Sequence, residues 1–90
     1  MNENLIKNLQ TFGLTEKQAE IFIYLYKFWA KPASIVANAI WWERTNVYKS
    51  LKQMWKSQMV SEITKKWIKH FFITDKNIFE NKINEEIKEI

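Results

Sequence analysis

The sequence predicts a mainly α-helical domain with a small β-hairpin, an α+β fold, and three observations lead to this class. Apolar residues recur at helical spacing in four consecutive segments between residues 3 and 57. Two β-prone segments separated by a short basic turn follow directly. The chain has 90 residues, of which 47% are hydrophobic and 16% aromatic, which suffices for one core but not for two. We therefore expect residues 1–90 to form a single domain.

The first two helices are expected over about residues 3–12 and 15–28. Gly13 is well placed to end the first helix in a left-handed conformation. Thr15 and Gln18 form a Thr-x-x-Gln capping box, which predicts the start of the second helix. The second helix is expected to be the centre of the core because its apolar face is wide; that face comprises Ala19, Phe22, Ile23, Leu25, Tyr26 and Phe28.

A third helix over about 32–40 and a fourth over about 43–57 are joined by a tight turn at Trp41-Trp42. Pro32 is tolerated in the first turn of a helix. The expected buried residues are Ile35, Val36, Ala39 and Ile40 in the third helix, and Val47, Tyr48, Leu51, Met54 and Trp55 in the fourth. The opposite face of the fourth helix holds Thr45, Lys49, Lys52 and Lys56. Two helices in this arrangement, the second with a polar and basic outer face, predict a helix-turn-helix.

The β-hairpin is expected to have strands at about 59–64 and 67–74, with Lys65-Lys66 at its tip. Asp75 can cap a last helix over about 75–90, in which apolar residues again recur at helical spacing. A hairpin directly after the second helix of a helix-turn-helix is the wing of a winged helix. The sequence therefore predicts a winged helix-turn-helix.

Positive charge is concentrated in the middle of the chain. Residues 31–70 hold seven lysines and one arginine against two glutamates, whereas residues 1–30 are neutral and residues 75–90 carry a net charge of −2. A basic middle segment is the electrostatic pattern expected for contacts with DNA phosphates. The candidate DNA-binding residues are Arg44, Thr45, Asn46, Lys49 and Lys52 on the recognition helix 43–57, and Lys65, Lys66 and Lys69 on the wing 65–69.

Several classes of function are excluded or disfavoured by composition. The chain has no cysteine, which excludes disulfides and thiolate metal sites. His70 is the only histidine and has no patterned carboxylates near it, so we expect no metal site and no cofactor. No nucleophile–base pair or phosphate loop is present, and we expect no enzyme activity. No apolar run could span a membrane and no signal-peptide core is present, so we expect a cytoplasmic protein.

The residues resemble a known family. Phe12-Gly13-Leu14-Thr15, followed by Ala19-x-x-Phe22-x-x-Leu25, is similar to the G-L-T-x-x-E-A opening of TrmB-type transcriptional regulators. Ile35-Val36 through Arg44-Thr45-x-Val47-Tyr48-x-x-Leu51 resembles the core motif of these proteins, and the resemblance covers about residues 5–90. It implies a winged-helix domain that binds double-stranded DNA as a homodimer, for which we expect the N- and C-terminal helices to form the interface. Members often add a C-terminal domain that binds sugars, and we expect no such effector domain in these 90 residues.

The sequence departs from this family pattern at Trp29, Trp41, Gln58 and Trp67, where members usually have glycine for a turn that needs positive φ. Three explanations are open: designed tryptophans, UGA codons that mean glycine but were read as tryptophan, or a homologue that tolerates tryptophan. Trp42 and Trp55 fit the codon explanation poorly, because their positions do not call for glycine, and Gln58 fits it poorly because it is not tryptophan. Two other functions are also open, a protein–protein interaction module and an engineered small-molecule binder that uses the indoles.

Overall fold

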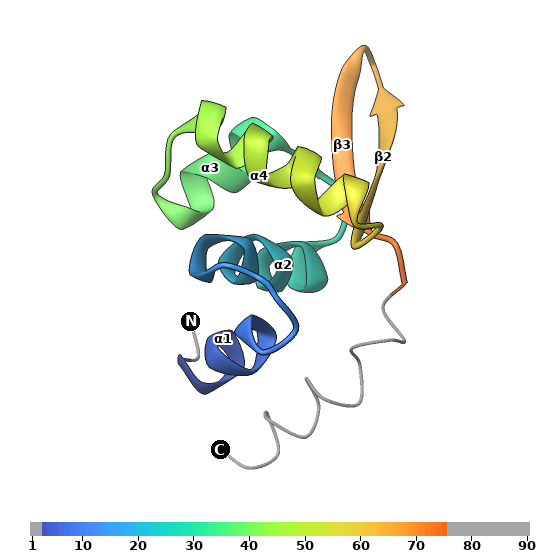
Figure 1. Ribbon diagram of the computed structural model, residues 1–90. Coiled ribbons are helices and arrows are strands. Elements are labelled where there is room, and N and C mark those ends of the chain that lie inside the picture. The colour runs from blue at the N-terminus through green and yellow to red at the C-terminus, as the bar shows by residue number, and fades with distance from the viewer. Residues whose placement is uncertain (1–2, 76–90) are drawn as a thin grey trace.

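The computed structural model describes residues 3–75. Along the chain these form α1 (Glu3–Gln10), α2 (Glu16–Phe28), β1 (Lys31–Pro32), α3 (Ala33–Ile40), α4 (Arg44–Lys56), β2 (Val60–Lys65) and β3 (Ile68–Ile73) (Figure 1). The four predicted helices and both wing strands are present, with ends that differ from the predicted ones by at most two residues. The helix expected over 75–90 lies outside the described residues, except for Asp75.

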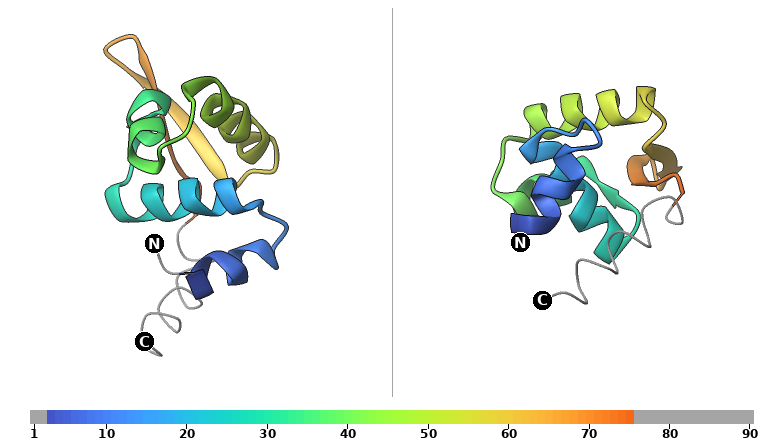
Figure 2. Two further views of the ribbon diagram at one scale, coloured as in Figure 1. Left: turned by 90° about the vertical axis from the view of Figure 1, so that its left-hand side faces the viewer. Right: turned by 60° about the horizontal axis from the view of Figure 1, so that its bottom comes forward.

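Helix α2 is the centre of the core, as predicted. Its capping box is formed, because the Thr15 N–H donates to Gln18 Oε1 and the Gln18 N–H donates to Thr15 Oγ1, both at 3.1 Å. The helix packs against α1, α3, α4 and β3, and Figure 2 shows the other helices arranged around it. Its buried apolar residues are Ala19, Ile21, Phe22, Ile23 and Leu25, whereas Phe28 at its end is exposed.

Two predictions about the inward faces of α3 and α4 are wrong in detail. In α3 the buried stripe is Ala33, Val36, Ala37 and Ile40, so Ile35 (43% exposed) and Ala39 lie on the outside. In α4 the buried apolar residues are Val47, Leu51 and Met54, and Trp55 is 50% exposed. Neighbouring residues of a helix are rotated by about 100°, so Ile35 and Trp55 are turned away from the buried Val36 and Met54.

A three-stranded antiparallel sheet has the order β1-β3-β2. Strand β1 was not predicted, since Lys31 and Pro32 were assigned to the opening of the third helix. They instead pair with Phe71 and His70 of β3, and Pro32 is the N-cap residue of α3. Proline lacks an N–H group and is therefore tolerated at a sheet edge such as β1.

Strands β2 and β3 form the wing, which projects beyond the helices (Figures 1 and 2). Its base is anchored in the core by Val60, Phe71 and Ile73, and the residues toward its tip are exposed. Lys65 pairs with Ile68, so the tip is Lys66-Trp67 and not Lys65-Lys66 as predicted. Both tip residues have positive φ, which is the pattern of the two-residue type I′ turn.

The four positions at which the sequence predicted a need for positive φ all have it. The φ angles are 65° at Trp29, 57° at Trp41, 65° at Gln58 and 68° at Trp67. Gln58 illustrates the geometry, since its N–H donates to the Trp55 carbonyl and the Met59 N–H donates to the Met54 carbonyl. These two bonds are the Schellman motif that ends a helix with a left-handed residue.

Candidate nucleic-acid interface

The outer face of α4 is rich in basic residues and has no acidic one. The helix holds four cationic side chains and no acidic one, and its buried stripe of Val47, Ser50, Leu51 and Met54 turns these cations to the outside. The cationic residues are Arg44, Lys49, Lys52 and Lys56, all exposed. Within residues 3–75 no carboxylate forms an ion pair with Arg44 or Lys49. Neither of these two cations is therefore neutralised by an ion pair within residues 3–75, and the face attracts anions.

The N-terminal end of α4 lies beside the wing across a groove of about 390 Å³. Arg44 and Tyr48 line the groove from α4, Lys69 and Trp67 line it from the wing, and Ser34 lines it from the start of α3. The fold thus brings Arg44 of α4 and Lys69 of the wing to one groove, although 25 positions separate them in the sequence. Ser34 was not predicted as a candidate site residue from the sequence. The available signal was that it lies two residues after Pro32, at the start of a predicted helix.

Tyr48 packs α4 against the wing. Its ring meets the buried ring of Phe71 edge-on, with centroids 6.2 Å apart and an interplanar angle of 79°. Lys52 Nζ lies 5.3 Å from the centroid of the same ring, which is within cation–π distance. Tyr48 therefore links α4 to β3 and also positions Lys52 on the outer face.

The three wing lysines have different surroundings. Lys65 and Lys66 are exposed near the tip, whereas Lys69 Nζ lies 3.5 Å from Glu62 Oε1 across the hairpin. The pair is partly exposed, so solvent weakens it without removing it. Glu62 was not singled out from the sequence, because its contact with Lys69 depends on the strand register, which pairs Glu62 with Phe71 and so brings it close to Lys69.

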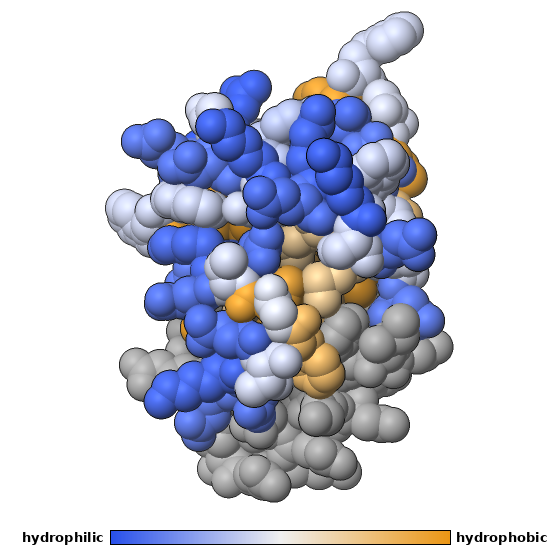
Figure 3. All heavy atoms as spheres, in the orientation of Figure 1, coloured by the Kyte–Doolittle hydropathy of each residue, from blue (hydrophilic) through white to orange (hydrophobic). Residues whose placement is uncertain are grey.

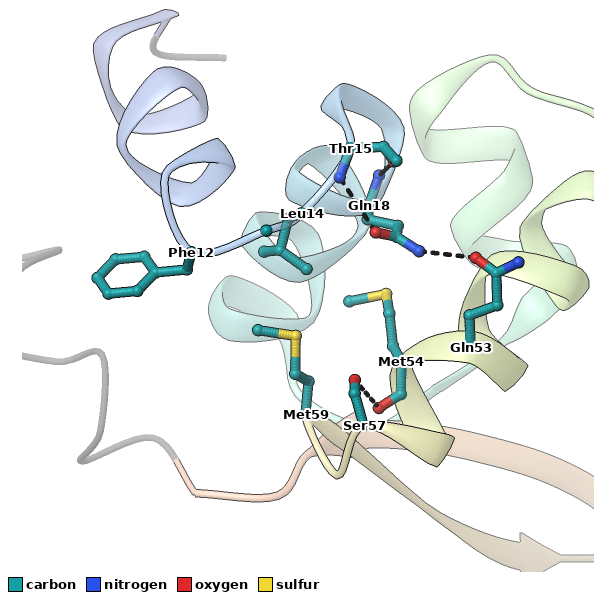
Figure 4. A pocket seen from close by; sticks show the side chains of 9 residues that line it. Phe12, Leu14, Thr15, Gln18, Gln53, Met54, Ser57 and Met59 are labelled. Carbon is teal, nitrogen blue, oxygen red and sulfur yellow. Dashed lines mark hydrogen bonds between the residues drawn. The ribbon is translucent and has the colours of Figure 1, made fainter.

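The C-terminal half of α4 is held against α2 by one polar bridge. Gln18, which is 8% exposed, donates from Nε2 to Gln53 Oε1 at 3.1 Å. Figure 4 shows this bond beside a pocket of about 510 Å³, into which Met54 and Met59 reach between the two helices. Gln18 of the capping box thus also connects α2 to α4.

The view of Figure 3 shows hydrophilic residues over α4 and also down the left side of the molecule toward α1. Hydrophobic residues come to the surface as a patch below α4, toward α2. The exposed tryptophans do not share one hollow, since Trp55 lines one with Gln58 and Trp67 lines the groove with Arg44. Within residues 3–75 no cluster of three metal-ligating side chains occurs, and no helix there is long and apolar enough to cross a membrane.

Comparison with known proteins identifies the relatives of this arrangement. The family model described as "Sugar-specific transcriptional regulator TrmB" matches residues 9–79, which is most of the chain. No curated protein matches this chain.

Three solved structures share the fold at low sequence identity. AbfR, in a disulfide-formed state, has a TM-score of 0.75 at 18% identity over 92% of this chain, which spans 60% of AbfR. MepR, a transcription regulator of the Staphylococcus aureus multidrug efflux pump MepA, has a TM-score of 0.70 at 15% identity over 98% of this chain and 74% of MepR. The transcriptional regulator Tm0710 from Thermotoga maritima has a TM-score of 0.69 at 19% identity over 90% of this chain and 67% of Tm0710.

Proposed function

Because this chain belongs to the TrmB family of transcriptional regulators, we propose that it binds double-stranded DNA in a sequence-specific manner and regulates transcription. The observation that supports this most is the pairing of an acid-free, basic face on α4 with a projecting basic wing across one groove. Its proposed location is the cytoplasm, and the proposal includes neither enzyme activity nor a cofactor.

Helix α4 is the proposed recognition helix. With side chains, an α-helix is roughly 10–12 Å wide, which matches a major groove of about 12 Å. Arg44, Thr45 and Asn46 at its start are proposed to reach base edges, where arginine pairs with guanine and asparagine with adenine. Lys49 and Lys52 lie further along the same exposed side and are proposed to contact phosphates.

The wing is the proposed second contact. Lys65, Lys66 and Lys69 are proposed to bind the flanking backbone or the minor groove, which adds affinity and salt dependence rather than sequence specificity. Glu62 partly neutralises the charge of Lys69, so we propose that Lys69 contributes less to DNA affinity than Lys66 does.

We further propose that the protein acts as a homodimer through its N- and C-terminal helices. Two recognition helices related by a two-fold axis read half-sites about 34–36 Å apart on one face of the duplex. The target is then a pseudo-palindrome with a spacing of about one helical turn. Sedimentation at several concentrations measures the assembly independently of DNA.

The test is selection of bound duplexes from a random pool, followed by affinity measurements on the enriched site. We expect Arg44→Ala to lose about 1–3 kcal/mol and to relax the preference at one base position. Lys49→Ala should weaken binding to all sequences alike. Lys27→Ala removes an equal charge from an exposed position in the last turn of α2 and should leave affinity unchanged. Failure to enrich any site, or equal losses in all three variants, would contradict the proposal.

A further inference from the structure

The five tryptophans fall into two groups by backbone conformation. Trp29, Trp41 and Trp67 have positive φ. Trp29 directly follows α2, Trp41 directly follows α3, and Trp67 lies at the wing tip. Trp42 and Trp55 do not have positive φ. Trp42 packs against the core near Lys17, and Trp55 lies within α4. The backbone at Trp42 and Trp55 therefore suits any L-residue, whereas the backbone at the other three tryptophans favours glycine.

Each of the three positive-φ positions belongs to a turn for which glycine is the preferred residue. Trp41 is left-handed directly after α3, and the Trp42 N–H donates to the Ala37 carbonyl, as in a Schellman motif. Trp67 is the second central residue of a two-residue hairpin turn, where Asn-Gly is the favoured pair. Trp29 has φ 65° and ψ −148°, next to a region populated essentially by glycine.

Little packing offsets the strain at two of these positions. The side chains of Trp41 and Trp67 are 93% and 98% exposed, so their indoles gain almost nothing from burial. Trp29 contacts Phe72 at 5.3 Å between ring centroids but is still 45% exposed. A bulky residue at positive φ costs on the order of 1–3 kcal/mol. The tryptophan side chains therefore do not explain why the backbone has this form.

Composition points the same way. The chain contains one glycine and five tryptophans in 90 residues, whereas glycine normally makes up roughly 7% of a protein, or about six residues here. The single glycine, Gly13, also has positive φ, in the turn after α1. Glycine is thus scarce at the turns that need it, and tryptophan stands there instead.

We infer that the protein made in its own cell contains glycine at positions 29, 41 and 67, where the codons are read as glycine and not as tryptophan. Gln58 and Lys66 also have positive φ, and the inference does not extend to them because neither is tryptophan. It is independent of the proposed function. If that function holds, glycine at 67 leaves Lys66 as the one side chain at the wing tip and lets the tip approach DNA closely.

Peptide mass spectrometry of the protein isolated from its own cells tests this directly. A glutamate-specific protease releases peptide 21–43 with Trp29, Trp41 and Trp42, peptide 44–62 with Trp55, and peptide 63–80 with Trp67. The mass of peptide 21–43 should be lower than the mass calculated from the printed sequence by two replacements of tryptophan by glycine. Fragment ions should place these two replacements at positions 29 and 41. Peptide 63–80 should be lighter by one such difference, and peptide 44–62 serves as the mass reference. Tryptophan at any of positions 29, 41 or 67 would overturn the inference.

Discussion

Replacing Trp41 with glycine should stabilise the fold, although the substitution removes a tryptophan, the largest type of side chain. The residue has φ 57° and ψ 47°, and its side chain is 93% exposed. Because the strain of a left-handed residue arises from its Cβ atom, glycine removes that strain, whereas alanine does not. The comparison of Trp41→Gly with Trp41→Ala therefore isolates the backbone effect from the loss of the indole.

The expected magnitude follows from two opposing effects. Relief of left-handed strain contributes about 1–2 kcal/mol, and the greater freedom of glycine in the unfolded chain costs about 0.5–1 kcal/mol. Loss of burial is negligible at 93% exposure. The net gain is roughly 0–1.5 kcal/mol, and its midpoint of about 0.75 kcal/mol corresponds to a rise in Tm of roughly 3–6 °C for a domain of this size. Trp41→Ala should remain within about 0.5 kcal/mol of the parent.

Thermal and urea denaturation followed by circular dichroism measure these differences. Trp42→Gly is the matched control, since Trp42 lacks positive φ and packs against the core. We expect that variant to be less stable than the parent. The reasoning would be refuted if Trp41→Gly were no more stable than Trp41→Ala.

Two further changes test the cap and the wing. Thr15→Ala removes the acceptor for the Gln18 N–H and should lower the free energy of unfolding by about 1 kcal/mol. Thr15→Ser keeps a hydroxyl acceptor and should retain most of that free energy in the same denaturation assay. Glu62→Gln removes the partner of Lys69 and should tighten DNA binding at low salt, with the gain fading as salt is added. Glu16→Gln removes an equal charge from an exposed position at the start of α2 that forms no ion pair with Lys69. This control should have no such effect on affinity, and an equal gain in both variants would contradict a local role for Glu62.

The elements set by local chemistry could be predicted from the sequence. The capping box at Thr15 and Gln18 involves residues three apart, so its side chains meet wherever the helix forms. The need for positive φ at Trp41 was likewise predicted, because the family that the sequence resembles usually has glycine in this turn.

The features that depend on distant partners could not be predicted. Strand β1 has only two residues and exists because β3 offers a free edge. The hairpin tip was placed one residue too early, since no Asn-Gly pair marks it and the register depends on how Val60 and Ile73 are buried together. The pairing of Lys69 with Glu62 follows from that register and was missed with it.

The candidate interface was predicted as a set of residues but not as an arrangement. Helical spacing alone turns Lys49 and Lys52 to the outside, because Val47 and Leu51 are buried. The groove between Arg44 and Lys69 requires the packing of Tyr48 on Phe71. That contact joins α4 to β3, and the periodicity of the sequence does not predict how these two elements pack.

The salt dependence of binding to the selected duplex tests the central proposal most directly. Five proposed phosphate contacts, from Lys49, Lys52, Lys65, Lys66 and Lys69, predict that log K falls against log salt with a slope of roughly −3 to −5 per protomer. Lys49→Ala should make that slope shallower by about 1. A flat dependence on salt, or a slope that Lys49→Ala leaves unchanged, would contradict the assignment of α4 and the wing as a DNA-binding surface.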